Sequence, residues 1–255
     1  EQKTALHGIL NSSNEHVILC GAAGTGTSTL LKHLCRAITA TGNPIVVLAP
    51  QAQQVRGLAK DDLPFPQTLA SALKAGKLPD HAVVICDETG QIGSTSLLEL
   101  FRLCRRHSCR LILSGDTRQH GPVERGDALR SLEKYAEVEI FSLQQNQRQN
   151  PAKARSREEA KRIEIYRKSV QTVAEGNVVA SIQLLDQIGG IQETTGDKLA
   201  VMAQNYLSHI SNGESVLAVS QTRAEVAQLN QSLRQALQQE GRIGPDQWEL
   251  AVLIS

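Results

Sequence analysis

The sequence is short of aromatic residues, with one Trp, three Tyr and three Phe among 255 residues. A core with so few rings must be aliphatic, and few rings remain to stack against nucleic-acid bases. The sequence also lacks an excess of either charge, since 27 Lys and Arg face 26 Asp and Glu, a net charge of +1. This balance excludes a strongly basic nucleic-acid coat protein and an acidic disordered tail.

No apolar run approaches the roughly 18–20 residues that cross a bilayer, and the first residues do not resemble a signal peptide. We therefore expect no membrane insertion and a cytoplasmic location. The five cysteines include no CxxC pair, and Cys20, Cys35 and Cys86 lie within apolar runs. This pattern indicates small buried side chains in a reducing compartment rather than disulfides or a zinc site.

Residues 1–150 alternate short apolar runs with longer helical patterns. The runs are rich in Val, Ile and Leu throughout, which is typical of strands buried on both faces. The alternation predicts an α/β fold, with a parallel sheet flanked by helices and with ligands at the carboxyl ends of the strands. The predicted strands are Val17–Cys20, Pro44–Ala49, Ala82–Cys86, Arg110–Ser114 and Val138–Leu143.

Residues 151–255 are predicted to form a linker and the start of a second α/β domain. The segment 148–168 is rich in Lys and Arg, and a helical stripe continues from it to Gly176. Because the strands that follow are too few to complete a sheet, we expect this domain to be truncated. The elements predicted in it are a helix over Lys198–Ser208, a strand over Val216–Val219, a helix over Val226–Leu237 and a strand beginning at Glu249–Ile254.

The loop after the first predicted strand matches the phosphate-loop pattern G-x-x-x-x-G-K-[ST] except that Thr27 replaces the lysine. Glycines allow backbone N–H groups to face phosphate oxygens, the next helix adds its positive end, and Ser28 supplies a hydroxyl for Mg²⁺. We predict a nucleotide site here, and the alternative is a glycine-rich turn without nucleotide. The predicted nucleotide-binding residues are Gly21, Ala22, Ala23, Gly24, Thr25, Gly26, Thr27, Ser28 and Thr29.

The missing lysine bears directly on catalysis. A charge-assisted hydrogen bond of the kind that it makes stabilises a bound phosphate by about 1.5–3 kcal/mol. Losing one such contact in a transition state slows a reaction by about 10²–10³. Since Thr27 offers only a neutral hydroxyl, we predict weak or absent hydrolysis.

Polar residues follow three further predicted strands. Asp87 and Glu88 end the third, and in a P-loop NTPase such acids hold Mg²⁺ and polarise the attacking water. We therefore predict Asp87 and Ser28 as the Mg²⁺ ligands and Glu88 as a catalytic residue, against the alternative of an acidic turn. Gln119, after the fourth strand, is predicted to sense the γ-phosphate. Arg148, after the fifth, is predicted to act as an arginine finger, or else to be a surface arginine in a basic linker.

These motifs resemble those of RecD-like superfamily 1 helicases, and more narrowly the helicase-like portion of conjugative relaxases of the MobF (TraI/TrwC) type. The segment 87–91 resembles motif II, 115–120 resembles motif III, and 119–130 is the stretch most specific for relaxases. The resemblance implies a RecA-like P-loop NTPase fold over 1–150, an incomplete second RecA-like domain after it, and ATP with Mg²⁺ as cofactors. It also implies that Gln2 reads adenine.

The resemblance further implies a 5′-to-3′ DNA helicase that acts on single-stranded DNA. Pro50 and Gln51 lie in a segment similar to motif Ia, which touches single-stranded DNA, and are predicted to bind it. We add Arg155, Arg157 and Lys161 from the basic segment, for which the alternative is a solvated helix face balanced by neighbouring glutamates. The basic cluster Arg102, Arg105, Arg106 and Arg110 is assigned to structure, because cations complement a helix C-terminus.

The partners implied are single-stranded DNA, other domains of the same relaxase polypeptide and a conjugative type IV secretion apparatus, in the bacterial cytoplasm. The sequence leaves three functions open. The chain is an ATP-driven helicase module, or a vestigial module that binds single-stranded DNA, as a secretion signal for example, without hydrolysing ATP. In the third, Thr27 is an engineered replacement of lysine that traps an inactive helicase fragment. Intact Asp87, Glu88, Gln119 and Arg148 favour an active ancestry, whereas Thr27 favours inactivity.

Overall fold

The structure, a computed structural model, describes residues 1–22, 24–119, 121–146 and 149–245. The chain divides into two compact units, Glu1–Arg167 and Lys168–Ser255. The first unit contains a sheet with helices, whereas the described part of the second unit is helical.

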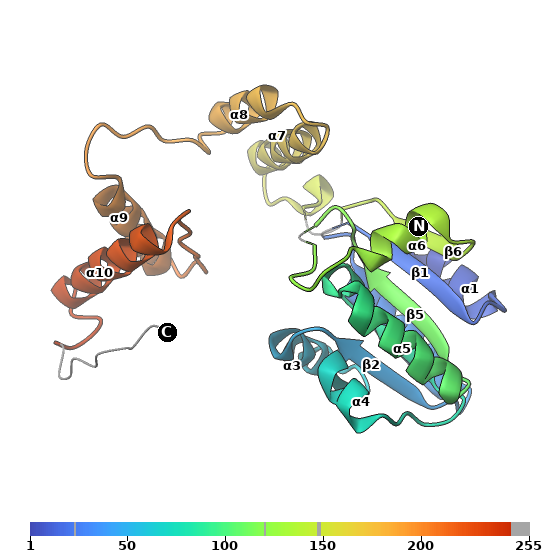
Figure 1. Ribbon diagram of the computed structural model, residues 1–255. Helices are drawn as coiled ribbons and strands as arrows, with labels where there is room; N and C mark the ends of the chain where they lie inside the picture. Colours follow the sequence, from blue (N-terminus) through green and yellow to red (C-terminus); the bar gives the residue numbers. More distant parts are fainter. Residues whose placement is uncertain (23, 120, 147–148, 246–255) are drawn as a thin grey trace. The chain divides into compact units, whose positions relative to one another are not determined.

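One six-stranded sheet, ordered β3-β2-β4-β5-β1-β6, forms the first unit, and every strand pairing in it is parallel (Figure 1). Parallel pairing brings the carboxyl ends of β1, β4 and β5 to the same edge of the sheet. The predicted RecA-like arrangement of a parallel sheet flanked by helices is confirmed. The strands are β1 (His16–Gly21), β2 (Ile45–Ala49), β3 (Pro66–Thr68), β4 (Val83–Cys86), β5 (Arg110–Gly115) and β6 (Glu139–Leu143).

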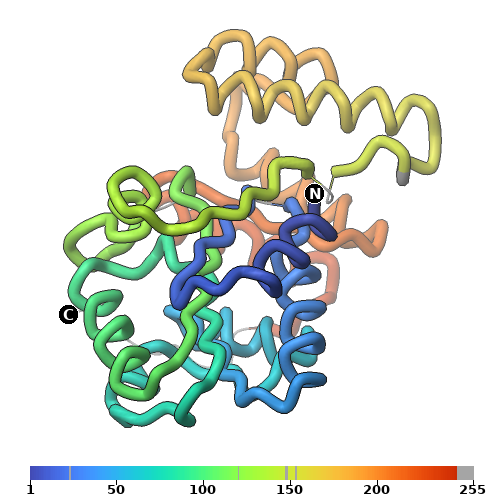
Figure 2. Tube along the Cα trace, turned by 90° about the vertical axis from the view of Figure 1, so that its right-hand side faces the viewer, coloured from blue at the N-terminus to red at the C-terminus, as the bar shows by residue number. Residues whose placement is uncertain are grey.

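The central strands are buried on both faces because alternate residues point into two separate cores. In β1, Val17 and Leu19 belong to one core, and Ile18 belongs to the other. Helices α1 (Gln2–Asn11), α2 (Thr27–Ala40) and α3 (Ala52–Lys60) cover the first face, where α1 and α2 lie side by side (Figure 2). Helices α4 (Leu69–Ala75), α5 (Ser94–Arg106) and α6 (Ala128–Tyr135) cover the second face.

Cysteine burial follows this layout. Cys35, Cys86, Cys104 and Cys109 are buried and free, as expected for small apolar side chains, and Cys20 is partly buried. Burial raises the pKa of the Cys86 thiol to about 12, so this sulfur stays protonated and unreactive.

Arg110 has the structural role expected for its cluster. Its guanidinium donates hydrogen bonds to the backbone oxygens of Ile9, at 2.7 Å, and Asn14, at 3.1 Å. These carbonyls lie at and beyond the last turn of α1, where a helix leaves its backbone acceptors without partners. Arg110 thereby attaches α1 to the start of β5.

Strand β3 was not predicted from the sequence. It is an edge strand that begins at Pro66 and pairs with Val47–Ala49 of β2. Proline is tolerated at the first residue of an edge strand because its missing N–H faces away from the ladder. A run as short as Pro-Gln-Thr carries no apolar signal of its own.

Helix α7 (Arg157–Ala174) contains the boundary between the two units, and a short helix, η2 (Pro151–Lys153), precedes it. In the second unit, the Ser169 and Ser181 hydroxyls are hydrogen-bonded at 2.8 Å, which joins α7 to α8 (Val178–Gln187). Helices α9 (Lys198–Ser211) and α10 (Arg223–Gln239) pack together and are linked by an ion pair between Lys198 and Glu225.

The prediction of a strand at Val216–Val219 is wrong, since these residues form no regular element. Leu217 is 84% exposed and Val219 is 70% exposed. A strand requires a hydrogen-bonded neighbour, and the described part of the second unit offers none. The strand predicted at Glu249–Ile254 lies outside the described residues, so the second RecA-like domain remains a prediction.

Over the described ranges, no helix combines the length and apolar character needed to span a bilayer.

Leu100→Ala is expected to lower the free energy of unfolding by about 2–5 kcal/mol, because it opens a cavity under α5. Leu100 is fully buried, whereas Leu98 on the same helix is 49% exposed. Leu98→Ala, the matched control, is expected to lower it by about 1 kcal/mol or less. Urea denaturation followed by circular dichroism measures both values, and equal losses for the two variants would contradict the assigned core.

Candidate functional site

The glycine-rich loop leads from the end of β1 into α2 by way of two left-handed backbone positions. Gly24 has φ 81° and Gly26 has φ 85°, conformations that side chains with a Cβ rarely adopt. The Thr25 hydroxyl is buried and donates a 2.8 Å hydrogen bond to the Ala22 oxygen, which closes the turn from within. The sequence thus folds locally into a loop that points the N-terminus of α2 toward the sheet edge.

Thr27 is the first residue of α2, with Gly26 as the N-cap. A Cβ placed on Gly21 would lie only 2.4 Å from the Thr27 hydroxyl oxygen. The Thr27 side chain therefore points back over the end of β1. The Thr27 hydroxyl also lies 3.4 Å from that of Thr25. Thr27 therefore presents a neutral hydroxyl at the base of the loop.

Asp87 immediately follows β4 and is held by the neighbouring strand. The buried Ser114 hydroxyl, in β5, donates a 2.9 Å hydrogen bond to Asp87 Oδ1, and the Asp87 N–H donates to the Leu48 oxygen at 2.8 Å. Burial raises the pKa of Asp87, against the lowering effect of the Ser114 bond. A cation beside this carboxylate would relieve the unfavourable burial of its charge.

Glu88 caps a short helix, η1 (Thr89–Gln91), from a left-handed backbone position with φ 52°. Burial raises the pKa of Glu88, and the negative charges of Asp87 and Asp116 add to this effect. Glu88 Oε2 accepts a 3.4 Å hydrogen bond from Gln91 Nε2, and this bond partly offsets the rise in the pKa of Glu88.

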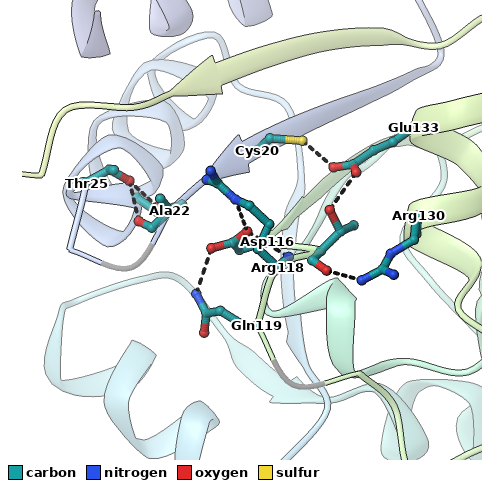
Figure 3. A network of polar contacts seen from close by, with 10 residues as sticks. Cys20, Ala22, Thr25, Asp116, Arg118, Gln119, Arg130 and Glu133 are labelled. Atoms are coloured by element: carbon teal, nitrogen blue, oxygen red, sulfur yellow. Dashed lines mark hydrogen bonds and ion pairs between the residues drawn. The ribbon is translucent and has the colours of Figure 1, made fainter. Parts of the chain in front are cut away.

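Asp116 organises the loop after β5 (Figure 3). Its side chain is 9% exposed, and Oδ1 accepts from the Arg118 backbone at 3.0 Å and from its guanidinium at 3.2 Å. Its Oδ2 accepts from Gln119 Nε2 at 3.3 Å. The adjoining Glu133 carboxylate, on α6, accepts from Thr117 at 2.8 Å and from the Cys20 thiol. These bonds tie the loop after β5 to the end of β1.

The structure brings most of the predicted nucleotide-site residues together around one cavity of about 210 Å³. Residues of the phosphate loop meet the acids after β4 and the polar residues after β5 there, as parallel strand ends should. Thr29, exposed on α2, and Thr25, buried in the loop, are not among the lining residues, while Ala23 and Arg148 lie outside the described residues. The lining residues are Gly21, Ala22, Gly24, Gly26, Thr27, Ser28, Asp87, Glu88, Ser114, Gly115, Asp116 and Gln119.

Gln2 lies against the back of the phosphate loop. Its Nε2 donates to the Thr25 oxygen at 2.8 Å and to the Gly26 oxygen at 3.4 Å. In this arrangement the side chain supports the loop backbone, and its role with adenine remains a prediction.

A second cavity, of about 540 Å³, contains the two residues of the motif Ia segment. Pro50 and Gln51 line it from the end of β2 and the start of α3, together with Gln91 and Gly121. The side chains of Arg155, Arg157 and Lys161 are exposed. The residues predicted to contact DNA are therefore accessible to a ligand, and DNA binding remains a prediction.

Sequence reasoning missed Ser114 and Gln91 as site residues, whereas Asp116 belongs to the segment that resembles motif III. Ser114 orients Asp87, Asp116 holds Gln119, and Gln91 holds Glu88. Ser114 could have been found, because polar residues at the end of a buried strand face the same sheet edge. Gln91 lies in the segment that resembles motif II, but nothing in the sequence indicated its bond to Glu88.

The residues present fit an Mg²⁺–nucleotide. The Ser28 hydroxyl and the Asp87 carboxylate line one cavity, and hard oxygen donors of this kind are the ligands that Mg²⁺ prefers. The left-handed glycines and the N-terminus of α2 provide backbone donors for phosphate.

This chain is similar to several known proteins. The family model described as "AAA domain" matches residues 1–196 of this chain. The conjugal transfer protein TraA of Rhizobium radiobacter is 27% identical over an alignment of 257 residues, which covers 96% of this chain and 22% of TraA. The ATP-dependent DNA helicase dda of Enterobacteria phage T4 is 30% identical over 146 residues, covering 49% of this chain and 33% of the phage protein.

Among solved structures, the Pif1 helicase from Candida albicans matches with a TM-score of 0.50 and 16% identity, covering 82% of this chain and 54% of Pif1. This match shows the shared fold. The chain spans about a fifth of TraA and a third of dda.

Asp87→Asn is expected to raise the free energy of unfolding of the Mg²⁺-free chain by roughly 0.5–2 kcal/mol near pH 8. Asparagine still accepts the Ser114 bond but has no charge to bury. Because folding raises the pKa of Asp87, the charge opposes folding above the folded-state pKa, and this effect vanishes below the ordinary value of 3.8. The gain should therefore disappear as the pH falls through that range.

Urea denaturation over a pH series measures this gain, with Asp61→Asn, at an exposed position, as the control that should show little change. Equal or lower stability of Asp87→Asn near pH 8 would contradict the assigned burial of charge.

Proposed function

Because this chain belongs to the AAA-domain family and is a RecD-like superfamily 1 helicase domain of the conjugative-relaxase type, we propose that it binds MgATP and single-stranded DNA. One observation carries the proposal. The phosphate loop, Asp87, Glu88 and Gln119 line a single cavity although they come from three separate strand ends.

In the proposed complex, the loop backbone and the N-terminus of α2 hold the phosphates. Ser28 and Asp87 hold Mg²⁺, which neutralises developing charge on the phosphates when bound. Glu88 accepts a proton from the attacking water, for which its raised pKa suits it. Gln119 orients groups near the terminal phosphate, and we keep Arg148 as the proposed arginine finger.

ATP hydrolysis in this proposed complex is slow. Thr27 supplies no cation for the β- and γ-phosphates, and charge developing there is stabilised less. Thr27 therefore favours a second candidate function, a domain that binds single-stranded DNA and hydrolyses little or no ATP. The proposed 5′-to-3′ helicase activity requires turnover, and binding alone does not.

DNA is proposed to lie over Pro50 and Gln51, because both line the second cavity. Gln91 of that cavity is hydrogen-bonded to Glu88 of the nucleotide cavity. The exposed Arg155, Arg157 and Lys161 are proposed to contact its phosphates. With so few aromatic side chains, binding would depend on the DNA backbone and show little sequence preference.

As in TraA, whose name assigns it to conjugal transfer, the domain is proposed to serve DNA transfer within a longer relaxase polypeptide. Partners would include the other domains of that polypeptide and the secretion apparatus. A domain that acts on ATP and DNA would work in the bacterial cytoplasm.

Thr27→Lys is expected to raise steady-state ATP turnover in the presence of an oligonucleotide by about 10²–10³, because the lysine restores a cation at the phosphates. A coupled ATPase assay measures the rate. The unmodified chain should show very low turnover with or without DNA.

Thr29→Lys is the matched control, since it adds the same charge to α2 but does not line the cavity, and it should leave turnover low. Adding Glu88→Gln to Thr27→Lys should abolish the gain. Substantial turnover by the unmodified chain would contradict the role given to Thr27, and no gain with Thr27→Lys would favour the binding-only function.

Replacing Arg155, Arg157 and Lys161 with glutamine is expected to weaken single-stranded DNA binding at low salt. Each lost phosphate contact should also reduce the slope of log K against log salt by about 0.7. Fluorescence anisotropy over a salt series measures both effects. The control replaces Arg102, Arg105 and Arg106, which removes the same charge from the end of α5. Equal effects of the two triple variants would argue against a specific contact.

A further inference from the structure

Three glutamines connect the second cavity, which is the proposed DNA groove, to the proposed catalytic acid Glu88. Gln51 Nε2, at the N-cap of α3, donates to Gln91 Oε1 at 2.9 Å, and Gln54 Nε2, one turn further on, donates to the same oxygen at 3.0 Å. On its other side Gln91 Nε2 donates to Glu88 Oε2 at 3.4 Å. The chain of bonds therefore runs from Gln51 through Gln91 to Glu88.

The direction of these bonds is fixed by chemistry. An ionised carboxylate only accepts hydrogen bonds, so Gln91 must turn its amino group to Glu88. Its carbonyl oxygen then faces α3, where it can pair only with donors, and the amino groups of Gln51 and Gln54 supply them. Consecutive bonds of this kind polarise and strengthen one another, so the loss of one bond weakens the next.

Gln91 also connects the two cavities. It lines the second cavity together with Pro50 and Gln51, and it is bonded to Glu88, which lines the nucleotide cavity. The 3.4 Å bond to Glu88 is longer than the usual 2.7–3.2 Å range. It is accordingly the longest bond of the three.

We propose that Gln91 is a positioning residue that restrains Glu88 in the DNA-free chain, and that single-stranded DNA in the groove releases Glu88 by taking the Gln51 amide. This inference rests on the proposed function. Phosphate and base oxygens of DNA are acceptors that compete with Gln91 for the Gln51 amino group. Once Gln91 loses that donor, its carbonyl oxygen keeps the bond from Gln54 but is held less firmly, so its side chain can change rotamer. Glu88, which already lines the nucleotide cavity, is then free to reorient within it.

The first test needs no ATP turnover and uses the chain as it stands. The side-chain amide signals of Gln51, Gln54 and Gln91 are assigned in ¹⁵N NMR spectra from single Gln→Met variants, which keep the shape of the side chain and remove its hydrogen bonds. Saturating oligothymidine should shift the Gln91 amide signal in the unmodified chain. Gln51→Met loses one proposed DNA contact, so oligothymidine is added until anisotropy shows saturation, and the Gln91 signal should then stay in place.

A Gln91 signal unmoved by saturating DNA, or moved equally in Gln51→Met, would overturn the relay. A chain that binds no oligothymidine at all would overturn the relay and the DNA-binding function together, because the relay would then have no input. The two failures are distinguished by anisotropy on the same samples.

The second test measures ATP turnover in the Thr27→Lys background. Gln91→Met should raise the DNA-free rate about three- to tenfold, as expected for loss of one restraining hydrogen bond. DNA should then stimulate it little further. Gln54→Met, which removes a support of Gln91 without touching the acid, should give a smaller change in the same direction.

Gln53→Met is the matched control, because Gln53 lies on α3 beside Gln54 but takes no part in these three bonds. It should keep the parental stimulation by DNA. Unchanged stimulation in both Gln91→Met and Gln54→Met, or a fall in the DNA-free rate of either, would overturn the relay and leave the proposed function intact.

Discussion

The proposed chemistry of this chain depends on the parallel pairing of β1, β4 and β5. Parallel strands end at the same edge, so Gly21, Asp87 and Asp116 meet there although long helices separate them in sequence. The pairing is stable because alternate residues of each strand enter two aliphatic cores, one on each face. A sheet buried on both sides leaves its polar residues no place except the strand ends.

That edge concentrates negative charge. Asp87, Glu88 and Asp116 line one cavity. Burial raises the pKa of Asp87 and of Glu88, and repulsion from Asp87 and Asp116 raises that of Glu88 further. Thr27 adds no positive charge to offset them. A triphosphate, itself an anion, would therefore depend on Mg²⁺ and on the backbone donors of the loop more than in a loop that contains lysine. The same shortage of positive charge is the physical basis of the slow hydrolysis that we propose.

Side-chain hydrogen bonds position the residues around the site. Ser114 orients Asp87 from the adjacent strand, Asp116 holds Gln119, and Gln91 connects Glu88 to the groove at Pro50 and Gln51. Such bonds are individually weak and therefore easily exchanged for bonds to a ligand. An edge arranged in this way can hold its residues in place when empty and still rearrange when DNA or nucleotide binds.

The sequence by itself determined the parallel α/β class, the approximate positions of five strands, the phosphate loop and the family resemblance, which the family match confirms. These follow from local patterns: buried runs of Val, Ile and Leu, and glycines at fixed spacing before a helix. Local patterns also misled, because Val216–Val219 has the composition of a strand but no partner in the described part of its unit. Tertiary structure alone decided the edge strand β3, the direction of Thr27, the support of the phosphate loop by Gln2 and the placement of Gln91. Each of these depends on contacts between residues far apart in sequence, which no local pattern records.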